Sequence, residues 1–288
     1  MNRPAGPIFL FRIALLVLLV LTVFPRQSSA ESAQEIVSKV VHIEIEADLR
    51  DHSRWMYRDA YKSPTQDVVK LIIQTPQGNL SQIIEDNGHP PTPQDRQADQ
   101  NRIQQMLTNP SLRQRQQRNE NHDSQQATDL MNMLPKAFLW QIDSQENGEI
   151  RLSYKPNPNF SPPSMSARVL ASMSGTMVVD ADQTRLKSLT GRLMQPVEFA
   201  WGLLGHLDAG GTFQIIRNEI APGIWQITQT HVHISGHVLF FKNIGDQEDE
   251  VTSDFRPVPD GVDLSEAARM LRDGEVARQV GVTTEARR

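Results

Sequence analysis

The sequence predicts a mainly β protein with α-helix (α+β): a curled antiparallel meander sheet, or half-barrel, covered by an N-terminal helix and a helical insertion. Three observations support this fold class. About nine short strand-like runs follow one another and are joined mostly by tight turns. A helical periodicity precedes them, and a polar Gln/Asn-rich stretch interrupts them. A sheet with so many strands must curl, and its concave side must be covered or filled.

The composition is that of a folded chain and excludes several classes of function. Of the 288 residues, 38% are hydrophobic and 22% are charged, with a net charge of −5. This balance leaves no domain-scale basic surface for the phosphates of a nucleic acid. The chain has no cysteine, which excludes disulfides, thiolate metal sites and a cysteine nucleophile. Nothing in the composition points to a cofactor.

Residues 1–30 have the pattern of a secretory signal peptide. Arginines flank the apolar run Ile13–Phe24, and the small residues Ser28–Ala30 form a cleavage site before Glu31. An uncleaved anchor is the alternative, but a membrane-spanning helix needs about 20 apolar residues. We therefore expect a mature protein in the periplasm or another extracytoplasmic compartment, without a permanent membrane span.

The mature chain opens with a helix, and strands follow it. In the stretch 31–50, apolar residues recur at spacings of three and four, which is the helical period. From about residue 55 the period becomes two. The runs 67–75 and 79–85 predict a hairpin around a turn that contains Pro76 and Gly78.

A change of composition marks an insertion at residues 89–134. It begins with a Pro-rich linker and continues as a Gln/Asn/Arg-rich stretch with two short amphipathic faces. These faces predict two helices over one side of the sheet, with the polar middle of the insertion in solvent. The alternative is a flexible insertion without function, because polar tracts need not pack.

Strand-like runs resume after the insertion and continue to about residue 256. The pair 137–143 and 149–154 predicts a hairpin with Asn147-Gly148 at its turn. We expect residues 31–260 to form a single curled-sheet domain that contains the insertion. Residues 261–288 are expected to be a helical and then disordered tail.

The segment Gly175–Leu193 (GTMVVDADQTRLKSLTGRL) carries a resemblance. It is a strand ending in Asp, an acidic turn, and a second strand with a basic residue. Together with the export signal, the N-terminal helix and the long meander, it resembles the periplasmic lipoprotein-carrier superfamily (LolA/LolB/RseB-like) at fold level. That resemblance implies a half-open β-barrel that holds acyl chains under helices. The chain also resembles exported bacterial proteins of unknown function.

Three hypotheses of function follow. The first is an exported, non-enzymatic binding protein that carries or senses a hydrophobic ligand, such as a lipid or a lipidated protein, in the cell envelope. The second is a structural or interaction module with a closed core, whose insertion binds an envelope protein partner. The third is a metal-assisted enzyme. The chain has no Gly-x-Ser-x-Gly elbow and no phosphate-binding loop signature.

The candidate residues for the first hypothesis are apolar side chains on the strands and a glycine-bearing loop at the rim. The cavity candidates are Val69, Leu71, Ile73, Phe138, Trp140, Val178, Phe199, Trp201, Ile215, Trp225, Phe240 and Phe241. In the loop 202–212, the candidates for a gate are Leu203, Leu204, Gly210 and Gly211. The alternatives are a closed core and a plain rim loop.

His231 and His233 are the weak candidates for a metal site. Residues at i and i+2 of a strand share a face, so the two imidazoles can bind one ion, and His237 has the same parity. In the alternative, Gly236 turns the chain, His237 lies elsewhere and the pair is ordinary polar surface. The acidic run 246–254 is expected to be a solvated loop.

Overall fold

The computed structural model describes residues 31–199, 205–238 and 247–285. Side chains at residues 199, 237–238 and 275–285 are not described. The chain divides into two compact units, Met1–Ser32 and Ala33–Arg288. The predicted signal peptide at 1–30 lies outside the described residues. None of the described helices combines the length and apolar character that a membrane crossing requires.

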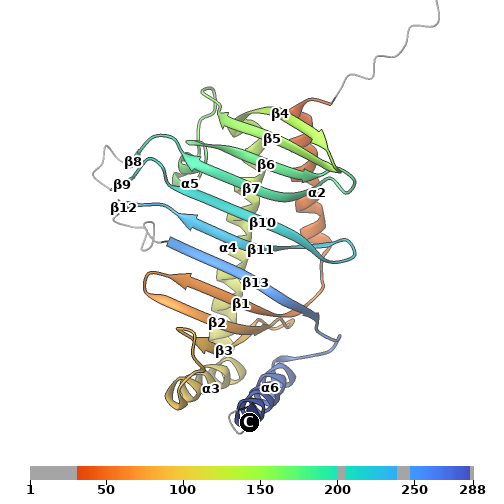
Figure 1. The fold of residues 1–288 in the computed structure, drawn as a ribbon, viewed down its shortest axis with the longest axis vertical. Helices are drawn as coiled ribbons and strands as arrows, with labels where there is room; N and C mark the ends of the chain where they lie inside the picture. Colours follow the sequence, from red (N-terminus) through yellow and green to blue (C-terminus); the bar gives the residue numbers. More distant parts are fainter. Residues whose placement is uncertain (1–30, 200–204, 239–246, 286–288) are drawn as a thin grey trace, which may run out of the picture. The chain divides into compact units, whose positions relative to one another are not determined.

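An open, curled antiparallel sheet of ten strands dominates the second unit, which confirms the predicted fold class (Figure 1). Its strand order is β3-β2-β1-β13-β11-β10-β7-β6-β5-β4. The strands are β1 (Trp55–Ser63), β2 (Gln66–Ile73), β3 (Leu80–Asp86), β4 (Phe138–Glu146), β5 (Glu149–Pro156), β6 (Met173–Asp180), β7 (Arg185–Leu193), β10 (Thr212–Ala221), β11 (Ile224–His233) and β13 (Gln247–Pro257).

The order departs from a simple meander at β13. This last strand lies between β1 and β11 and pairs antiparallel with both, so it joins the two halves of the sheet. The expectation of a solvated acidic loop at 246–254 is therefore wrong for the described part, Gln247–Pro257. Acidic side chains are tolerated in this strand because alternate residues of β13 point to opposite faces, and both faces are accessible there.

A second, three-stranded sheet has the order β12-β9-β8. It contains β8 (Val197–Phe199), β9 (Gly205–Leu207) and β12 (Gly236–Val238). Val197 and Leu207 of this sheet pack with Met173 and Leu193 at the ends of β6 and β7 in a small apolar cluster.

Five helices accompany the sheets in the described residues: α2 (Ala33–Arg50), α3 (Pro93–Thr108), α4 (Pro110–Ala137), α5 (Met165–Leu170) and α6 (Leu264–Glu285). Two helices occupy the insertion, as predicted, and Asn109 separates them, but the expectation that both cover one side of the sheet is wrong, because α3 and α4 pack on opposite faces. Its side chain accepts hydrogen bonds from the backbone N–H groups of Ser111 and Leu112 and so caps α4. The helix α6 continues past Gly274, where the sequence predicted a frayed end.

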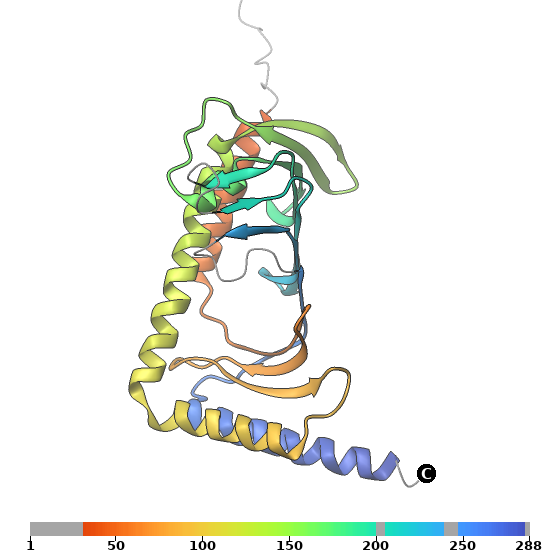
Figure 2. The same ribbon diagram turned by 90° about the vertical axis from the view of Figure 1, so that its left-hand side faces the viewer.

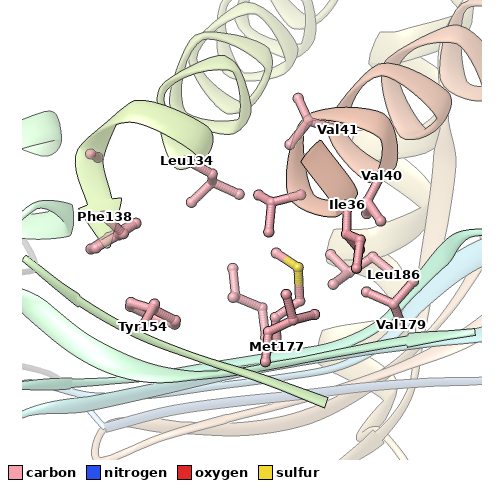
Figure 3. Packing of buried hydrophobic residues seen from close by; sticks show 13 residues of the cluster. Ile36, Val40, Val41, Leu134, Phe138, Tyr154, Met177, Val179 and Leu186 are labelled. Atoms are coloured by element: carbon pink, nitrogen blue, oxygen red, sulfur yellow. The ribbon is translucent and has the colours of Figure 1, made fainter. Parts of the chain in front are cut away.

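The helices α2 and α4 cover one face of the sheet, which we call the inner face; the other is the outer face (Figure 2). Ile36, Val37, Val40 and Val41 of α2 point into a core over β4–β7, together with Leu134 at the end of α4 (Figure 3). Each fully buried aliphatic side chain of this kind contributes about 1.5–3 kcal/mol. This first core holds the helices against one half of the sheet.

A second core lies on the outer face of the other half. There α3 and α6 pack against β1–β3 (Figure 2), with Ile73, Leu80, Ile103 and Leu271 at its centre. Strand alternation fixes the side: Ile73 is paired with Met56, whereas Tyr57, one residue on, points to the inner face. The two cores therefore lie on opposite faces and leave the inner face of β1, β13 and β11 between them.

Candidate binding site on the inner face

Two adjoining cavities open where β11 begins. Their volumes are about 220 and 410 Å³, and both are lined by Gln226 and Ile227. The smaller cavity is lined further by Trp55, Tyr57, Gln74, Thr228, Gln229, Thr230, Glu250, Thr252 and Phe255. The larger is lined further by Ala47, Asp48, Arg50, Asp51, Arg185, Arg217, Gly223, Ile224 and Trp225. The site therefore combines the end of α2 with β1, β11 and β13.

A bulge in β11 shapes the boundary between the cavities. Ile216 of β10 pairs with Gln229, but the next residue, Arg217, pairs with Ile227, so Thr228 is the extra residue. The hydroxyl of Thr228 accepts a hydrogen bond from the side chain of Asn218 at 2.6 Å. The side chain of Ile227 remains 46% exposed, although it is large and apolar.

A buried ion network holds α2 against the sheet beside the larger cavity. Glu44 of α2, 2% exposed, accepts hydrogen bonds from Arg185 at 3.0 and 2.9 Å and from the backbone N–H of Leu186 at 2.6 Å. Arg217 adds a contact of 3.0 Å to the same carboxylate. Burial lowers the pKa of Arg217, and its Nε atom has no hydrogen-bond partner. Both carboxylate oxygens of Glu44 thus have hydrogen-bond partners, whereas the guanidinium of Arg217 keeps one donor without a partner.

Two carboxyl groups meet on the inner face next to the smaller cavity. Asp59 of β1 is 8% exposed and is hydrogen-bonded to Glu250 of β13, and Lys70 of β2 is paired directly with Asp59 in the sheet. Burial raises the pKa of both carboxyl groups. The charge and hydrogen bond of Asp59 raise the pKa of Glu250 as well, so Glu250 is the partner that holds the shared proton.

An aromatic wall bounds the same cavity. The rings of Tyr57 and Phe255 are stacked with centroids 5.2 Å apart, and Trp55 meets Phe255 edge-on at 6.3 Å. Burial raises the pKa of Tyr57 to about 12, and the nearby charges of Asp59, Glu250 and Glu120 act in the same direction. The wall is therefore apolar in surface and lies in a field of negative charge.

The structure separates the predicted cavity residues by face. Phe138, Trp140, Ile215 and Trp225 belong to the inner face, whereas Val69, Leu71, Ile73 and Val178 belong to the outer face. Trp225 is the residue of this set that lines a cavity, where the guanidinium of Arg185 lies 5.8 Å from its ring centre. Phe138 and Ile73 lie fully buried in the two cores.

The remaining candidates belong to the rim. Trp201, Leu203, Leu204, Phe240 and Phe241 lie outside the described residues, as does the side chain of Phe199. Both glycines of the proposed gate are tied to β7: the N–H of Gly210 donates to the carbonyl of Leu193 at 2.7 Å, and the carbonyl of Gly211 accepts from the N–H of Leu193 at 2.7 Å.

Sequence reasoning missed Tyr57, Asp59, Glu250 and Phe255 as site residues. The alternation that starts at Trp55 does place Tyr57 and Asp59 on one face. The strands β1 and β13 pair in the sheet but lie far apart in the sequence, so no local signal predicts their contact.

The histidine pair lies on the outer face. His231 and His233 both contact the same oxygen of Asp249, at 2.6 and 3.1 Å, and these hydrogen bonds lower the pKa of Asp249. His237 is in β12, where it pairs with His206, so the turn at Gly236 separates it from the other two. Among the described residues, no group of three or more His, Asp or Glu side chains has the arrangement of a metal site.

No family model and no curated protein matches the chain. Two solved structures align with 79% of this chain and 95% of their own length. One is a putative outer membrane lipoprotein-sorting protein domain from Vibrio parahaemolyticus (10% identity, TM-score 0.32), and the other is a DUF1329 family protein from Desulfovibrio piger (11% identity, TM-score 0.24). At these TM-scores, neither alignment transfers a ligand or a residue's role to this chain.

Proposed function

We propose that this chain is a non-enzymatic, extracytoplasmic binding protein that holds a hydrophobic or amphipathic ligand, such as a lipid or a lipidated protein, on the inner face of its sheet. The proposal contains no covalent step. The observation that carries it is the exposed side chain of Ile227 between two joined cavities.

The distribution of the cores supports this proposal. Because the two cores lie on opposite faces at opposite ends of the sheet, neither core of the described residues covers the inner face between them. Ile227 offers exposed apolar surface there, and Trp55, Trp225 and Phe255 also line the two cavities. Burial of an acyl chain against such surface contributes about 0.8 kcal/mol per CH₂.

A substitution at Ile227 tests the proposal. An apolar fluorescent probe should bind the mature protein and change tryptophan emission, because Trp55 and Trp225 line the cavities. Ile227→Asp should weaken probe binding tenfold or more, since the new carboxylate lies in the apolar contact. Val251→Asp is the matched control: Val251 is an exposed aliphatic residue on the outer face of the neighbouring strand, opposite Gln229.

A closed-core module predicts the opposite result. In that case the wild-type protein binds no probe, and Ile227→Asp and Val251→Asp are indistinguishable. Mass spectrometry of the exported protein checks the compartment separately, because the proposal expects a chain that begins at Glu31.

A further inference from the structure

The smaller cavity has the size and the wall of a headgroup site. At about 220 Å³ it is smaller than the ~300–1,000 Å³ of most small-molecule pockets, so it fits a single functional group better than a whole lipid. Trp55, Tyr57 and Phe255, the aromatic wall, are among the residues that line it. Ring faces attract cations, and quaternary ammonium ligands are commonly bound in this way.

Acidic side chains outnumber basic ones around the aromatic wall. Asp59, Glu248 and Glu250 belong to the inner face of β1 and β13, and Lys70 is the cation that faces them from β2. The hydroxyl of Tyr61 donates to Glu248 at 3.2 Å, so this carboxylate is held in place. The surplus of carboxylates favours a positively charged occupant.

One polar atom of the cluster is left without a partner. The Oδ1 atom of Asp59 is fully buried and accepts no hydrogen bond, although the residue is 8% exposed. A buried acceptor in this state is unusual because its desolvation is uncompensated. Asp59 is paired with Thr252, which lines the cavity, and shares a face with Tyr57, so its carboxylate lies directly behind the cavity lining.

We propose that the smaller cavity binds an alkylammonium group, so that the ligand of the inner face is an amphiphile with a cationic headgroup. The aromatic wall contacts the methyl or methylene groups around the nitrogen, and the Asp59–Glu250 pair, which shares one proton and keeps one negative charge, provides the counter-charge. The tail lies against the exposed side chain of Ile227, which lines both cavities. This inference rests on the function proposed above.

Three probes with the same twelve-carbon tail test the headgroup: dodecyltrimethylammonium, neutral dodecyl maltoside and dodecyl sulfate, each below its micelle concentration. Titration calorimetry should show the ammonium probe binding at least tenfold more tightly than the other two. The double variant Asp59→Asn with Glu250→Gln should abolish this preference while the affinity for the neutral probe stays within twofold. The two amides replace the protonated forms of both side chains, so the fold is expected to persist, and thermal melts verify this.

A matched control separates a local effect from general charge. Asp254→Asn removes an exposed carboxylate of the same strand whose contact to Arg58 is 3.8 Å. This variant should keep the preference. Equal affinity for the three probes, a preference for dodecyl sulfate, or a preference that survives in the double variant would overturn the inference while leaving the proposed function standing. If none of the probes binds, the proposed function fails as well.

Discussion

At the scale of single residues, Glu44 is the centre of the buried ion network that holds α2 against the sheet. It is the buried carboxylate that satisfies Arg185 and Arg217 and also accepts from the backbone of β7. A buried ion pair adds little net stability when it is complete, but removing one partner leaves a buried charge uncompensated. The helical pattern of α2 indicates a buried face, but it does not indicate that a glutamate belongs to that face.

Glu44→Gln should lower the free energy of unfolding by about 3–5 kcal/mol, because two guanidinium groups lose their counter-charge. Urea denaturation measures this change. Glu46→Gln is the control on the same helix: Glu46 pairs with Arg50 at the surface, and such pairs contribute about 0–1 kcal/mol. Equal effects of the two substitutions would show that the network has no special role.

The pair Asp59–Glu250 gives stability a pH dependence. The folded protein holds a proton above the ordinary carboxyl pKa of about 4, whereas the unfolded chain has lost it. The contribution of this pair to the free energy of unfolding is therefore fully present below about pH 4. It decreases as the pH rises through the raised pKa of Glu250. In urea denaturation from about pH 4 to pH 8, the free energy of unfolding of the wild type minus that of Glu250→Gln should decrease steadily as the pH rises. A difference independent of pH would contradict the assignment of the proton.

At the scale of elements, the hairpin β6–β7 depends on two glycines that face each other. Gly175 and Gly191 form a directly opposed pair, and the ring of Phe213 and the hydroxyl of Tyr154 lie over Gly191. A Cβ atom on Gly175 would lie 1.9 Å from the carbonyl oxygen of Thr190, which belongs to the backbone of the partner strand. The backbone of β7 at Gly175 and the side chains over Gly191 therefore require glycine at these two positions.

Gly175→Ala should destabilise the protein by about 1–3 kcal/mol or more, because the backbone of β7 must move to accept the methyl group. Chemical denaturation monitored by circular dichroism is the measurement. Ser174→Ala, one residue earlier on the outer face, should change stability by less than about 0.5 kcal/mol. Comparable losses for both variants would point to strand propensity instead of close approach.

At the scale of the whole second unit, the insertion of β13 decides where a ligand can bind. This strand, from the far end of the chain, brings Glu250 and Phe255 beside Tyr57 and Asp59. The cores on either side cover the two ends of the sheet, and neither of these described cores covers its centre. The candidate site is a product of the sheet order, since β1, β11 and β13 each contribute to its lining.

Local patterns in the sequence determined the fold class and many of the individual helices, strands and turns. The period of three to four at residues 31–50 predicted α2, the alternation from Trp55 predicted β1, and Asn147-Gly148 predicted the turn between β4 and β5. These signals are reliable because each depends on neighbouring residues: helix and strand periods and turn conformations are properties of a few consecutive positions.

The tertiary structure alone decided which face each strand buries and which residues meet. Leu71 and Ile73 read as cavity residues in the sequence, but α3 and α6 cover their face, so they form a core. Glu250 read as part of a solvated loop, but its strand pairs with β1 at a distance of about 190 residues along the chain. Alternation gives two faces without saying which is inner, and non-local pairing depends on the packing of the whole sheet.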